Sequence, residues 1–548
     1  MKIFQPKIIE SLRHYSGKQL MNDVIAGVIV AIIALPLSIA LAIASGAEPQ
    51  QGLYTAIVAG FVIALFGGSR VNISGPTAAF AVIVAGIIEQ HHYSGLVIAT
   101  VMAGIILILM GIFKLGSLIK YIPTTITTGF TAGIALTIAI GQIKDFLGVK
   151  YPDDINPIET FEKVEALVKN ISTANLWSLL VGAVCLAVLI VWPKISKKIP
   201  GSLIAVVIGV AFVAILNRCG ITSVQTIGSQ FDEIKGGLPQ FKLPEGITFE
   251  TVSALLPSAF TIAILAAIES LLSCVVSDGM INDKHNSNTE LIAQGAGNIF
   301  SGLFGGIPAT GAIARTAANV KNGGRSPISG MVHSVVLLLV LVVLMQYAKF
   351  IPMPTIAAIL FMVAYNMSEW KKFVKVCKGA PKSDIFVLVL TFALTVAFDL
   401  VVAIEVGLLV ALVLFMKRME EVTHIRPWTN EDDTEQIKNV PENAKIYDID
   451  GALFFATSEK IPNLCDDTET KVVIFRMHGV QTLDITALWT LEKVHKKYVD
   501  AGTRVLFSHV NVQPLSVMKK SGFYAEAGAE AFVENIDEAL KVAKDICV

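Results

Sequence analysis

The sequence has little charge for its length, and this shortage excludes a wholly soluble protein. Only 16% of its 548 residues are charged and 54% are hydrophobic, whereas a soluble domain carries about 25% charged residues. The shortage is uneven, because residues 417–548 hold 38 charged side chains and residues 1–416 hold 49. We therefore predict a large membrane domain followed by a small soluble one.

A strong excess of one charge sign is also missing, since the formal net charge is −1. That value combines a net +5 in residues 1–416 with a net −6 in residues 417–548. Neither part carries the basic excess of a nucleic-acid-binding domain. We therefore expect no nucleic-acid partner.

Cysteine is scarce, and the six cysteines show no CxxC pair and no metal-ligand spacing. A Gly-rich phosphate loop is missing as well. We expect no metal, no cofactor and no enzymatic activity. A cleavable signal peptide is not evident either, because residues 1–22 are polar and the apolar run that starts near Val24 is long enough to span a bilayer.

Long apolar runs dominate the rest of the chain, and we count fourteen segments. They lie near residues 24–44, 50–66, 76–89, 95–113, 124–141, 175–192, 201–217, 253–276, 289–304, 309–319, 328–348, 354–366, 384–397 and 400–416. An even number places both termini on one side of the membrane. With that side cytoplasmic, the inner loops hold 18 Lys and Arg residues and the outer loops hold eight, as the positive-inside rule requires.

Two of these segments are interrupted by glycine and proline. They are the stretches 72–80 (Asn-Ile-Ser-Gly-Pro-Thr-Ala-Ala-Phe) and 305–315 (Gly-Gly-Ile-Pro-Ala-Thr-Gly-Ala-Ile-Ala-Arg). They are the third segments of the first and second seven, a placement typical of an inverted-repeat transporter with half-helices at mid-membrane. Two helix starts facing each other would bind an anion with their free N–H groups and positive dipole ends. The alternative is that Gly-Pro merely kinks two packed helices.

Two ionisable residues, Glu269 and Arg315, fall inside segments. A charge at this depth is costly and should face a partner or a water-filled cavity. Arg315 would add a fixed positive charge beside the helix dipoles. Burial and the Arg315 charge act on Glu269 in opposite directions, so Glu269 is poised to take up a proton when an anion arrives. The alternative is a static Glu–Arg ion pair.

Four weaker candidates also draw attention. Ser273 lies one turn beyond Glu269 and would line the same face, although serine on a membrane helix is more often a packing residue. We expect His333 to be a hydrogen-bonded core residue. We expect Asp278 and Asp283, at the end of the eighth segment, to be solvated.

The chain resembles the SulP family of anion transporters over essentially its whole length. The likeness rests on Ala34-Leu35-Pro36-Leu37-Ser38, Gly52-Leu53-Tyr54, Ser74-Gly75-Pro76-Thr77, and Arg315 with Asn319-Val320. The resemblance implies an α-helical polytopic membrane protein of fourteen segments in 7+7 inverted repeats. It also implies core and gate domains, elevator-like movement of the core, and homodimers.

The family's anion site lies between the starts of segments three and ten, with residues from segments one and eight. Carried onto this chain, the resemblance implies proton coupling through Glu269. It also implies substrate contacts from Leu37, Leu41, Ala78, Ala79, Phe80, Ser273, Ala312, Ile313, Ala314 and Arg315. Leu37 and Leu41 are aliphatic where the family often carries a polar and an aromatic residue.

The C-terminal part alternates strand-like and helix-like patterns. We predict strands at 446–455, 471–477 and 504–510, and helices at 486–499, 514–521 and 535–546, which makes a small α/β domain. In its place after the membrane domain it resembles a STAS domain. Leu483-Asp484-Ile485-Thr486 matches the loop before that domain's central helix, and Asp484 suits an N-terminal helix cap better than a catalytic acid.

We therefore divide the chain into a cytoplasmic segment 1–22, a transport domain 23–418, a linker 419–440 and a STAS domain 441–548. We expect it to lie in the bacterial inner membrane with both termini in the cytoplasm. We predict proton-coupled uptake of C4-dicarboxylates such as succinate, fumarate or aspartate, because within the family the chain looks most similar to enterobacterial aerobic C4-dicarboxylate transporters.

The alternatives are a sulfate or bicarbonate transporter, an exchanger, channel or electrically driven motor of the same family, and a membrane-anchored signalling protein. We expect the partners to be a small anion, a coupling proton, the bilayer, a second copy of the chain, and a cytoplasmic regulator that binds the STAS domain.

Overall fold

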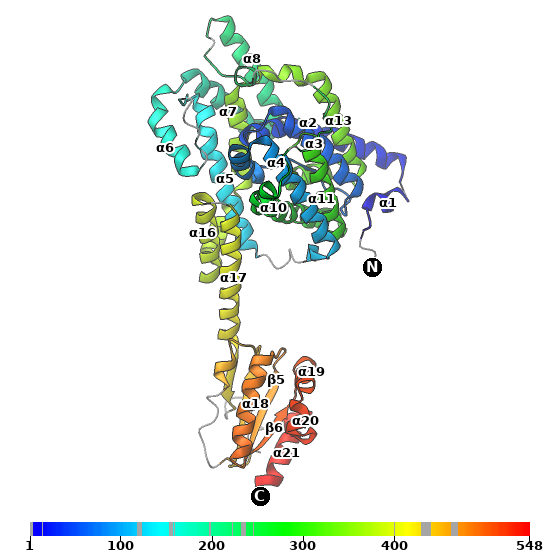
Figure 1. The fold of residues 1–548 in the computed structure, drawn as a ribbon, viewed down its shortest axis with the longest axis vertical. Coiled ribbons are helices and arrows are strands. Elements are labelled where there is room, and N and C mark those ends of the chain that lie inside the picture. Colours follow the sequence, from blue (N-terminus) through cyan, green and yellow to red (C-terminus); the bar gives the residue numbers. More distant parts are fainter. Residues whose placement is uncertain are drawn as a thin grey trace. The chain divides into compact units, whose positions relative to one another are not determined.

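The computed structural model divides the chain into two compact units, Met1–Leu408 and Leu409–Val548 (Figure 1). It describes residues 4–13, 15–117, 123–152, 157, 159–196, 199–221, 223–231, 237–244, 246–398, 400–428, 440–461 and 470–547. The predicted helical membrane fold with a small sheet domain is confirmed, because the first unit is almost wholly helical and the second holds a five-stranded sheet.

Every one of the fourteen predicted segments falls on a helix of the structure. These helices are α2 (Gly17–Ala44), α3 (Pro49–Phe66), α4 (Ala81–Ile112), α5 (Thr124–Leu147), α7 (Leu176–Ile195), α8 (Gly201–Arg218), α10 (Phe249–Ile281), α11 (Ser287–Leu303), α12 (Ile313–Lys321), α13 (Ile328–Leu344), α14 (Met353–Met367), α16 (Lys382–Ala397) and α17 (Leu400–Val422). Segments three and four share α4, in which His92 departs from helical geometry (φ 57°, ψ −178°).

Eight of the helical stretches in the described residues are long and apolar enough to cross a membrane by themselves. They are Gly17–Ala44, Pro49–Phe66, Ala78–Ile112, Thr124–Leu147, Leu176–Ile195, Gly201–Arg218, Phe249–Ile281 and Ile328–Phe350. α12 is too short, and α11 carries Glu290, Gln294 and Asn298 along its length. These two helices therefore depend on protein neighbours for burial.

Helix packing in the first unit repeats between its two halves. α3 packs on α13 as α11 packs on α4, and α2 packs on α13 as α10 packs on α4 (Figure 1). A third pair of contacts follows the same rule, because α5 packs on α16 as α7 packs on α14. In each pair of contacts, moving both helices by seven segments along the chain turns one contact into the other. The contact of segments 2 and 11 (α3 and α13), for example, becomes the contact of segments 9 and 4 (α11 and α4). The packing therefore has the predicted seven-plus-seven repeat.

Short helices connect the long ones in the first unit. They are α1 (Lys7–Leu12), α6 (Thr160–Asn170), α9 (Ile227–Gln230) and α15 (Trp370–Gly379), together with short 3-10 stretches at Ala78–Phe80, Ile171–Thr173 and Met345–Phe350.

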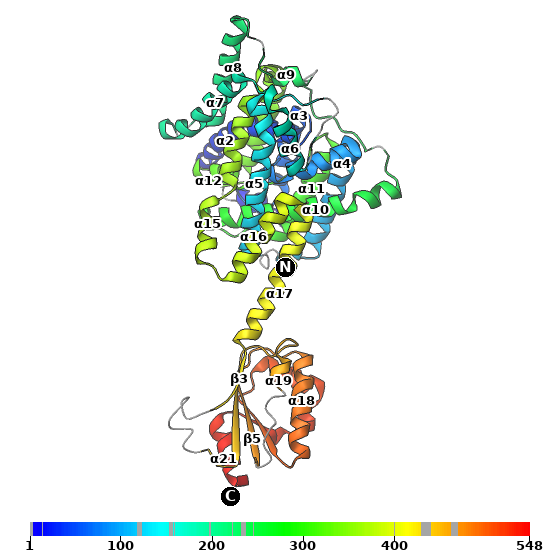
Figure 2. The same ribbon diagram turned by 90° about the vertical axis from the view of Figure 1, so that its left-hand side faces the viewer.

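The second unit is a sheet of order β3-β4-β5-β6-β7, formed by His424–Pro427, Ala444–Asp450, Val472–Gly479, Arg504–Ser508 and Phe532–Val533. β4 to β7 are parallel, and β3 is an antiparallel edge. Helices α18 (Ile485–Asp500), α19 (Val512–Ser521), α20 (Phe523–Ala527) and α21 (Ile536–Cys547) complete the unit. α18 and α21 pack on opposite faces of the sheet (Figure 2).

All three predicted strands and all three predicted helices of this domain are present, with shifted ends. β4 stops at Asp450 rather than Phe455, because Gly451 takes φ +109° and a register shift interrupts the pairing between Asp448 and Asp450. β3 lies inside the stretch 419–440 that we predicted as linker. Its short polar sequence gives no strand signal, and it pairs only as an exposed edge of β4.

Candidate anion-binding site

The two interrupted segments meet inside the first unit, as predicted. Ser74–Gly75 (β1) pairs antiparallel with Thr310–Gly311 (β2), and the amide of Ala312 donates to the carbonyl of Ile73 over 2.8 Å. Directly after this contact, each of the two segments starts a helix. One begins with the turn Ala78–Phe80 and continues as α4, and the other is α12.

Neither helix start is capped by a side chain in the described part of the chain. Thr77 and Ala312 hold the N-cap positions, and no side-chain cap hydrogen bond is formed at either. The first N–H groups of a helix have no partner within the helix, so an uncapped start offers them to a ligand. Aligned peptide dipoles add roughly half a positive charge at each start. Both features favour an anion between the two starts.

Arg315 adds a full positive charge to this break. Its side chain is only 3% exposed, and its Nη2 donates to the carbonyl of Pro76 over 3.1 Å. Nη1 has no hydrogen-bond partner among the described residues, and no carboxylate there lies within ion-pair distance of the guanidinium. The buried charge is therefore free to compensate an anion.

Gly75 is required for this placement of Arg315. A Cβ atom on Gly75 would lie 2.7 Å from Nη1 of Arg315 and 3.5 Å from the Cα of Ala56. Real side chains do not tolerate the first distance, so the guanidinium would have to move. The glycine of the Gly-Pro pair thus permits the close approach of Arg315.

Glu269 on α10 contacts the same break. The Thr77 hydroxyl donates to Oε2 of Glu269 over 2.9 Å, and the Glu269 side chain is half-buried in α10. Glu269 forms no ion pair with Arg315. The structure therefore does not contain the static Glu–Arg ion pair that we left open. Instead, Arg315 binds Pro76 and Glu269 binds the next residue, Thr77.

The remaining predicted site residues divide by burial. Ala78, Ala79, Phe80 and Ala312 are buried, whereas Ile313 and Ala314 at the α12 start are exposed, Ile313 by 42%. Leu41 packs in the same apolar cluster as Ala78 and Phe80. Leu37 packs instead against the cluster that α7, α8 and α14 form. The structure thus places Leu41 in the large core cluster that also holds the break residues Ala78 and Phe80, and Leu37 beside a different group of helices.

Ser273 lies behind the break rather than on its open face. It is fully buried, and its hydroxyl donates to Oδ1 of Asn72 over 2.8 Å and to Oγ1 of Thr316 over 3.1 Å. Thr316 also accepts from the amide of Ile73. The packing role that we left open for Ser273 fits these contacts better than the lining role.

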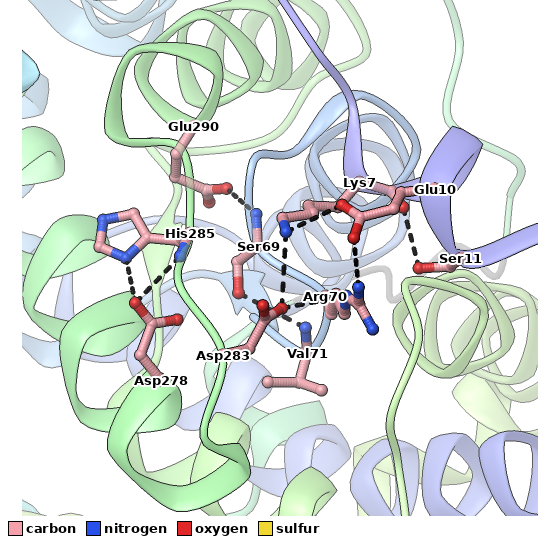
Figure 3. Close-up of polar contacts among 10 residues, drawn as sticks. All are labelled: Lys7, Glu10, Ser11, Ser69, Arg70, Val71, Asp278, Asp283, His285 and Glu290. Carbon is pink, nitrogen blue, oxygen red and sulfur yellow. Dashed lines mark hydrogen bonds and ion pairs between the residues drawn. The ribbon is translucent and has the colours of Figure 1, made fainter.

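Two minor expectations are wrong. His333 is buried, but neither ring nitrogen has a partner among the described residues, so it is not a hydrogen-bonded core histidine. Asp283 is not simply solvated, because its Oδ2 lies 3.0 Å from Arg70 Nε and 3.6 Å from Lys7 Nζ (Figure 3). Asp278 accepts from both the amide and the ring of His285 (Figure 3). Asp278 lies near the end of α10 and Asp283 and His285 lie in the loop before α11, while Lys7 comes from α1 and Arg70 follows α3.

Sequence reasoning missed two buried carboxylates that hold the break in place. Glu290 on α11 accepts from the amides of Gly68 (2.9 Å) and Ser69 (3.2 Å) and from the side chains of Asn72 (2.8 Å) and Gln294 (3.1 Å). Figure 3 shows Glu290 directed at Ser69. Glu290 therefore holds in place the segment 68–72, which leads into β1.

Asp23 does the same for the chain that follows α12. It accepts from the amides of Arg325 (2.7 Å) and Ser326 (3.3 Å) and from the Tyr15 hydroxyl (2.7 Å). Both carboxylates sit at the edge of a predicted segment, where a charged residue looks like an ordinary solvated end. Nothing in their local sequence therefore marked them as buried.

A cavity of about 270 Å³ opens beside these helices. It is lined by α4 between Val82 and Gln90, by Pro257, Ser258 and Thr261 of α10, and by the end of α16, with Thr137, Glu159 and Thr160 from α5 and α6. Thr261 lies two turns before Glu269 on α10. The cavity thus lies between α4 and α10 on one side and α5, α6 and α16 on the other, and no residue of the break itself lines it.

Comparison with known proteins gives the same picture. The Sulfate permease family profile matches residues 20–391, and the STAS domain profile matches residues 434–539. The chain is 40% identical over 530 residues to "Putative sulfate transporter YvdB" of Bacillus subtilis, which covers 96% of this chain and 98% of that protein. It is 30% identical over 551 residues to "Bicarbonate transporter BicA" of Picosynechococcus, covering 96% and 95%.

Among solved structures, the murine anion transporter Slc26a9 matches with a TM-score of 0.88 over 98% of this chain and 94% of that one, at 18% identity. The TM-score shows that the two chains share a fold, but at this low identity the match says nothing about the substrate.

Proposed function

Because the chain belongs to the sulfate permease family and is an anion transporter rather than an enzyme, we propose that it is a secondary active carrier of sulfate. One relative is named a sulfate transporter, and bicarbonate is the second candidate because another relative is named a bicarbonate transporter. The C4-dicarboxylate substrate that we predicted finds no support among these relatives. The proposal rests on one observation, namely that two uncapped helix starts and an unpaired arginine nitrogen converge on the same short break.

The charge at the break favours a compact dianion. Two helix starts contribute about half a positive charge each and Arg315 contributes one, giving about two positive charges. Sulfate carries two negative charges on one compact group and so balances these two positive charges. Succinate has the same charge, but a four-carbon chain holds its two carboxylates apart. The positive groups here gather at one break, with Arg315 at the carbonyl of Pro76 and the helix starts at Thr77 and Ala312. This geometry is our reason to prefer sulfate.

Glu269 is our candidate for coupling transport to protons. When it is ionised, the site loses about one positive charge and suits a monoanion. When it is protonated, the full positive charge is available for a dianion. Binding of sulfate therefore favours uptake of a proton by Glu269, and the Thr77 hydroxyl links that carboxyl to the anion-binding break. Sulfate and a proton would then cross together.

The packing supports a rocking or elevator movement of one helix group against another. α2, α3, α4 and α10 to α13 form the group that carries the break, and α5, α7, α14 and α16 pack together as a second group. The cavity lies along their boundary. We place it on the outer side, because the loop that contains Glu159 and Thr160 belongs to the predicted exterior.

The remaining features of the proposal follow from the family and the charge pattern. We propose a bacterial inner-membrane location with both termini in the cytoplasm, a homodimer, and a regulator that binds the STAS domain. The runner-up from another class is a channel or electrically driven motor, and Glu269 argues against it because a channel needs no titratable site.

Uptake by reconstituted liposomes tests these statements. An inward proton gradient should drive accumulation of labelled sulfate above equilibrium, bicarbonate should compete, and labelled succinate should enter poorly. A proton ionophore should abolish the accumulation. Concentrated succinate without concentrated sulfate would overturn the substrate assignment. Sulfate uptake that never exceeds equilibrium would overturn the coupling and favour a channel.

A further inference from the structure

α15 is a short helix that separates basic from apolar residues. Its lysines all lie on one side and are exposed, and they are Lys371, Lys372, Lys375 and Lys378. Its apolar residues all lie on the other side, and they are Trp370, Phe373, Val374, Val376 and Cys377. None of its residues is buried in the structure. Such a helix does not belong to the protein core and is typical of a membrane surface.

The neighbours of α15 place it at the end of apolar helices. It follows α14, precedes α16, and packs on α5 and α16 (Figure 2). The Phe373 ring packs edge-on against Phe392 of α16, with ring centroids 5.4 Å apart. Trp370 Nε1 donates to the hydroxyl of Tyr365 over 3.2 Å. Tryptophan and tyrosine at the ends of apolar helices are typical of the bilayer interface.

The lysines have few acidic partners in the protein. Lys372 pairs with Glu369 over 3.1 Å, and Lys371 lies over the Trp370 ring at 5.8 Å. No ion pair with a carboxylate of the described residues is formed by Lys375 or Lys378. A short helix with this much uncompensated positive charge should attract an anionic surface.

We propose that α15 lies in the inner leaflet interface and binds anionic phospholipid headgroups. The lysines would contact the phosphates, while Trp370 and Val374 would enter the boundary of the acyl chains. These two side chains are 47% and 38% exposed in the protein. The helix would thereby hold α5, α14 and α16 against the leaflet while the helices that carry the break move. This inference rests on the membrane setting of the proposed function but not on its substrate.

The acidic C-terminal domain is the competing partner, since residues 417–548 carry a net −6. An acidic protein surface would satisfy the lysines but would give no reason for exposed aromatic and aliphatic side chains beside them. A bilayer interface satisfies both sets at once. The combination therefore favours lipid.

Hydrogen exchange of the full chain in nanodiscs tests the proposal without measuring transport. We expect the amides of α15 to exchange at least fivefold more slowly in discs that contain phosphatidylglycerol than in pure phosphatidylcholine, and high salt should reduce the difference. The triple variant K371Q/K375Q/K378Q should lose it, since each lysine near an anionic surface contributes about fivefold in affinity. The triple variant K493Q/K496Q/K541Q, with the same change in charge on the C-terminal domain, should keep it.

Three results would overturn the assignment. One is equal exchange in both lipids. Another is an anionic-lipid effect that survives in K371Q/K375Q/K378Q. The third is protection of α15 that does not depend on lipid but disappears in that variant, which would assign the lysines to the acidic domain. A transporter that fails to move sulfate could still give the expected exchange pattern, so the two proposals can fail separately.

Discussion

Removal of the Arg315 charge should change the selectivity between dianions and monoanions. In the variant R315Q the side chain stays polar but is shorter than arginine, so it loses the hydrogen bond to the carbonyl of Pro76 together with the fixed charge at the break; the lost hydrogen bond affects both kinds of anion alike, whereas the lost charge does not. An anion about 5 Å from the guanidinium, at an effective dielectric of about 20, interacts by about 3 kcal/mol for each unit of its own charge. A dianion therefore loses about twice as much as a monoanion.

The difference of about 3 kcal/mol corresponds to roughly a hundredfold change in the ratio of the two affinities. Equilibrium binding of labelled sulfate, with nitrate as the monoanion in competition, measures that ratio in purified protein. R315K serves as the matched control because it keeps the charge, and it should retain most of the selectivity. Thermal unfolding of each variant checks that the fold survives.

An equal loss of sulfate and nitrate affinity in R315Q would refute this reasoning. It would mean that Arg315 acts only by holding Pro76 in place. Unchanged affinity for both anions would remove Arg315 from the site altogether.

Four further predictions follow. E269Q should abolish proton-driven accumulation of sulfate in liposomes while binding persists, whereas E250Q, on an exposed position of the same helix, should behave as wild type; concentrative uptake by E269Q would end the coupling proposal. G75A should displace Arg315 and lower sulfate affinity at least tenfold, with a loss of stability of about 1–3 kcal/mol for overpacking; normal affinity in a binding assay would contradict the close approach. D484A should destabilise the C-terminal domain by about 1–2 kcal/mol, because it loses the bond from the amide of Ala487 at 2.8 Å, and thermal unfolding of the full chain would reveal no shift if the cap were unimportant. Burial lowers the pKa of His495, so the unfolded chain takes up a proton first and stability should fall as pH drops below about 6.5; a pH profile of unfolding that H495Q leaves unchanged would contradict this.

The sequence was sufficient to predict the meeting of two interrupted segments, because glycine and proline inside an apolar run mark a helix that starts within the membrane. The Asp484 cap was also predictable, and its side chain accepts from the amide of Ala487 as expected. Both predictions depend on local chemistry within a few residues. Such signals are visible without any knowledge of distant partners.

Features that depend on distant partners were not visible. Glu290 and Asp23 lie at segment ends, and nothing local distinguishes a carboxylate that binds amides more than two hundred residues away from a solvated one. The alternative of a static ion pair between Glu269 and Arg315 could not be decided from the sequence, and in the structure they hold neighbouring residues of the break. β3 was missed because an edge strand of four residues takes its hydrogen bonds from a neighbour and needs no apolar pattern of its own.

Helices of each half pack on helices of the other half, and this affects how the protein is inserted into the membrane during synthesis. α3 ends at Phe66, but α13, on which it packs, begins only at Ile328, and α4 likewise lacks α11 until Leu303 has been synthesised. When the first seven segments enter the bilayer, the helix surfaces that later pack on the second half must therefore be covered by lipid or by an insertion chaperone. A truncation after the first half should be inserted yet remain unassembled and open to membrane proteases.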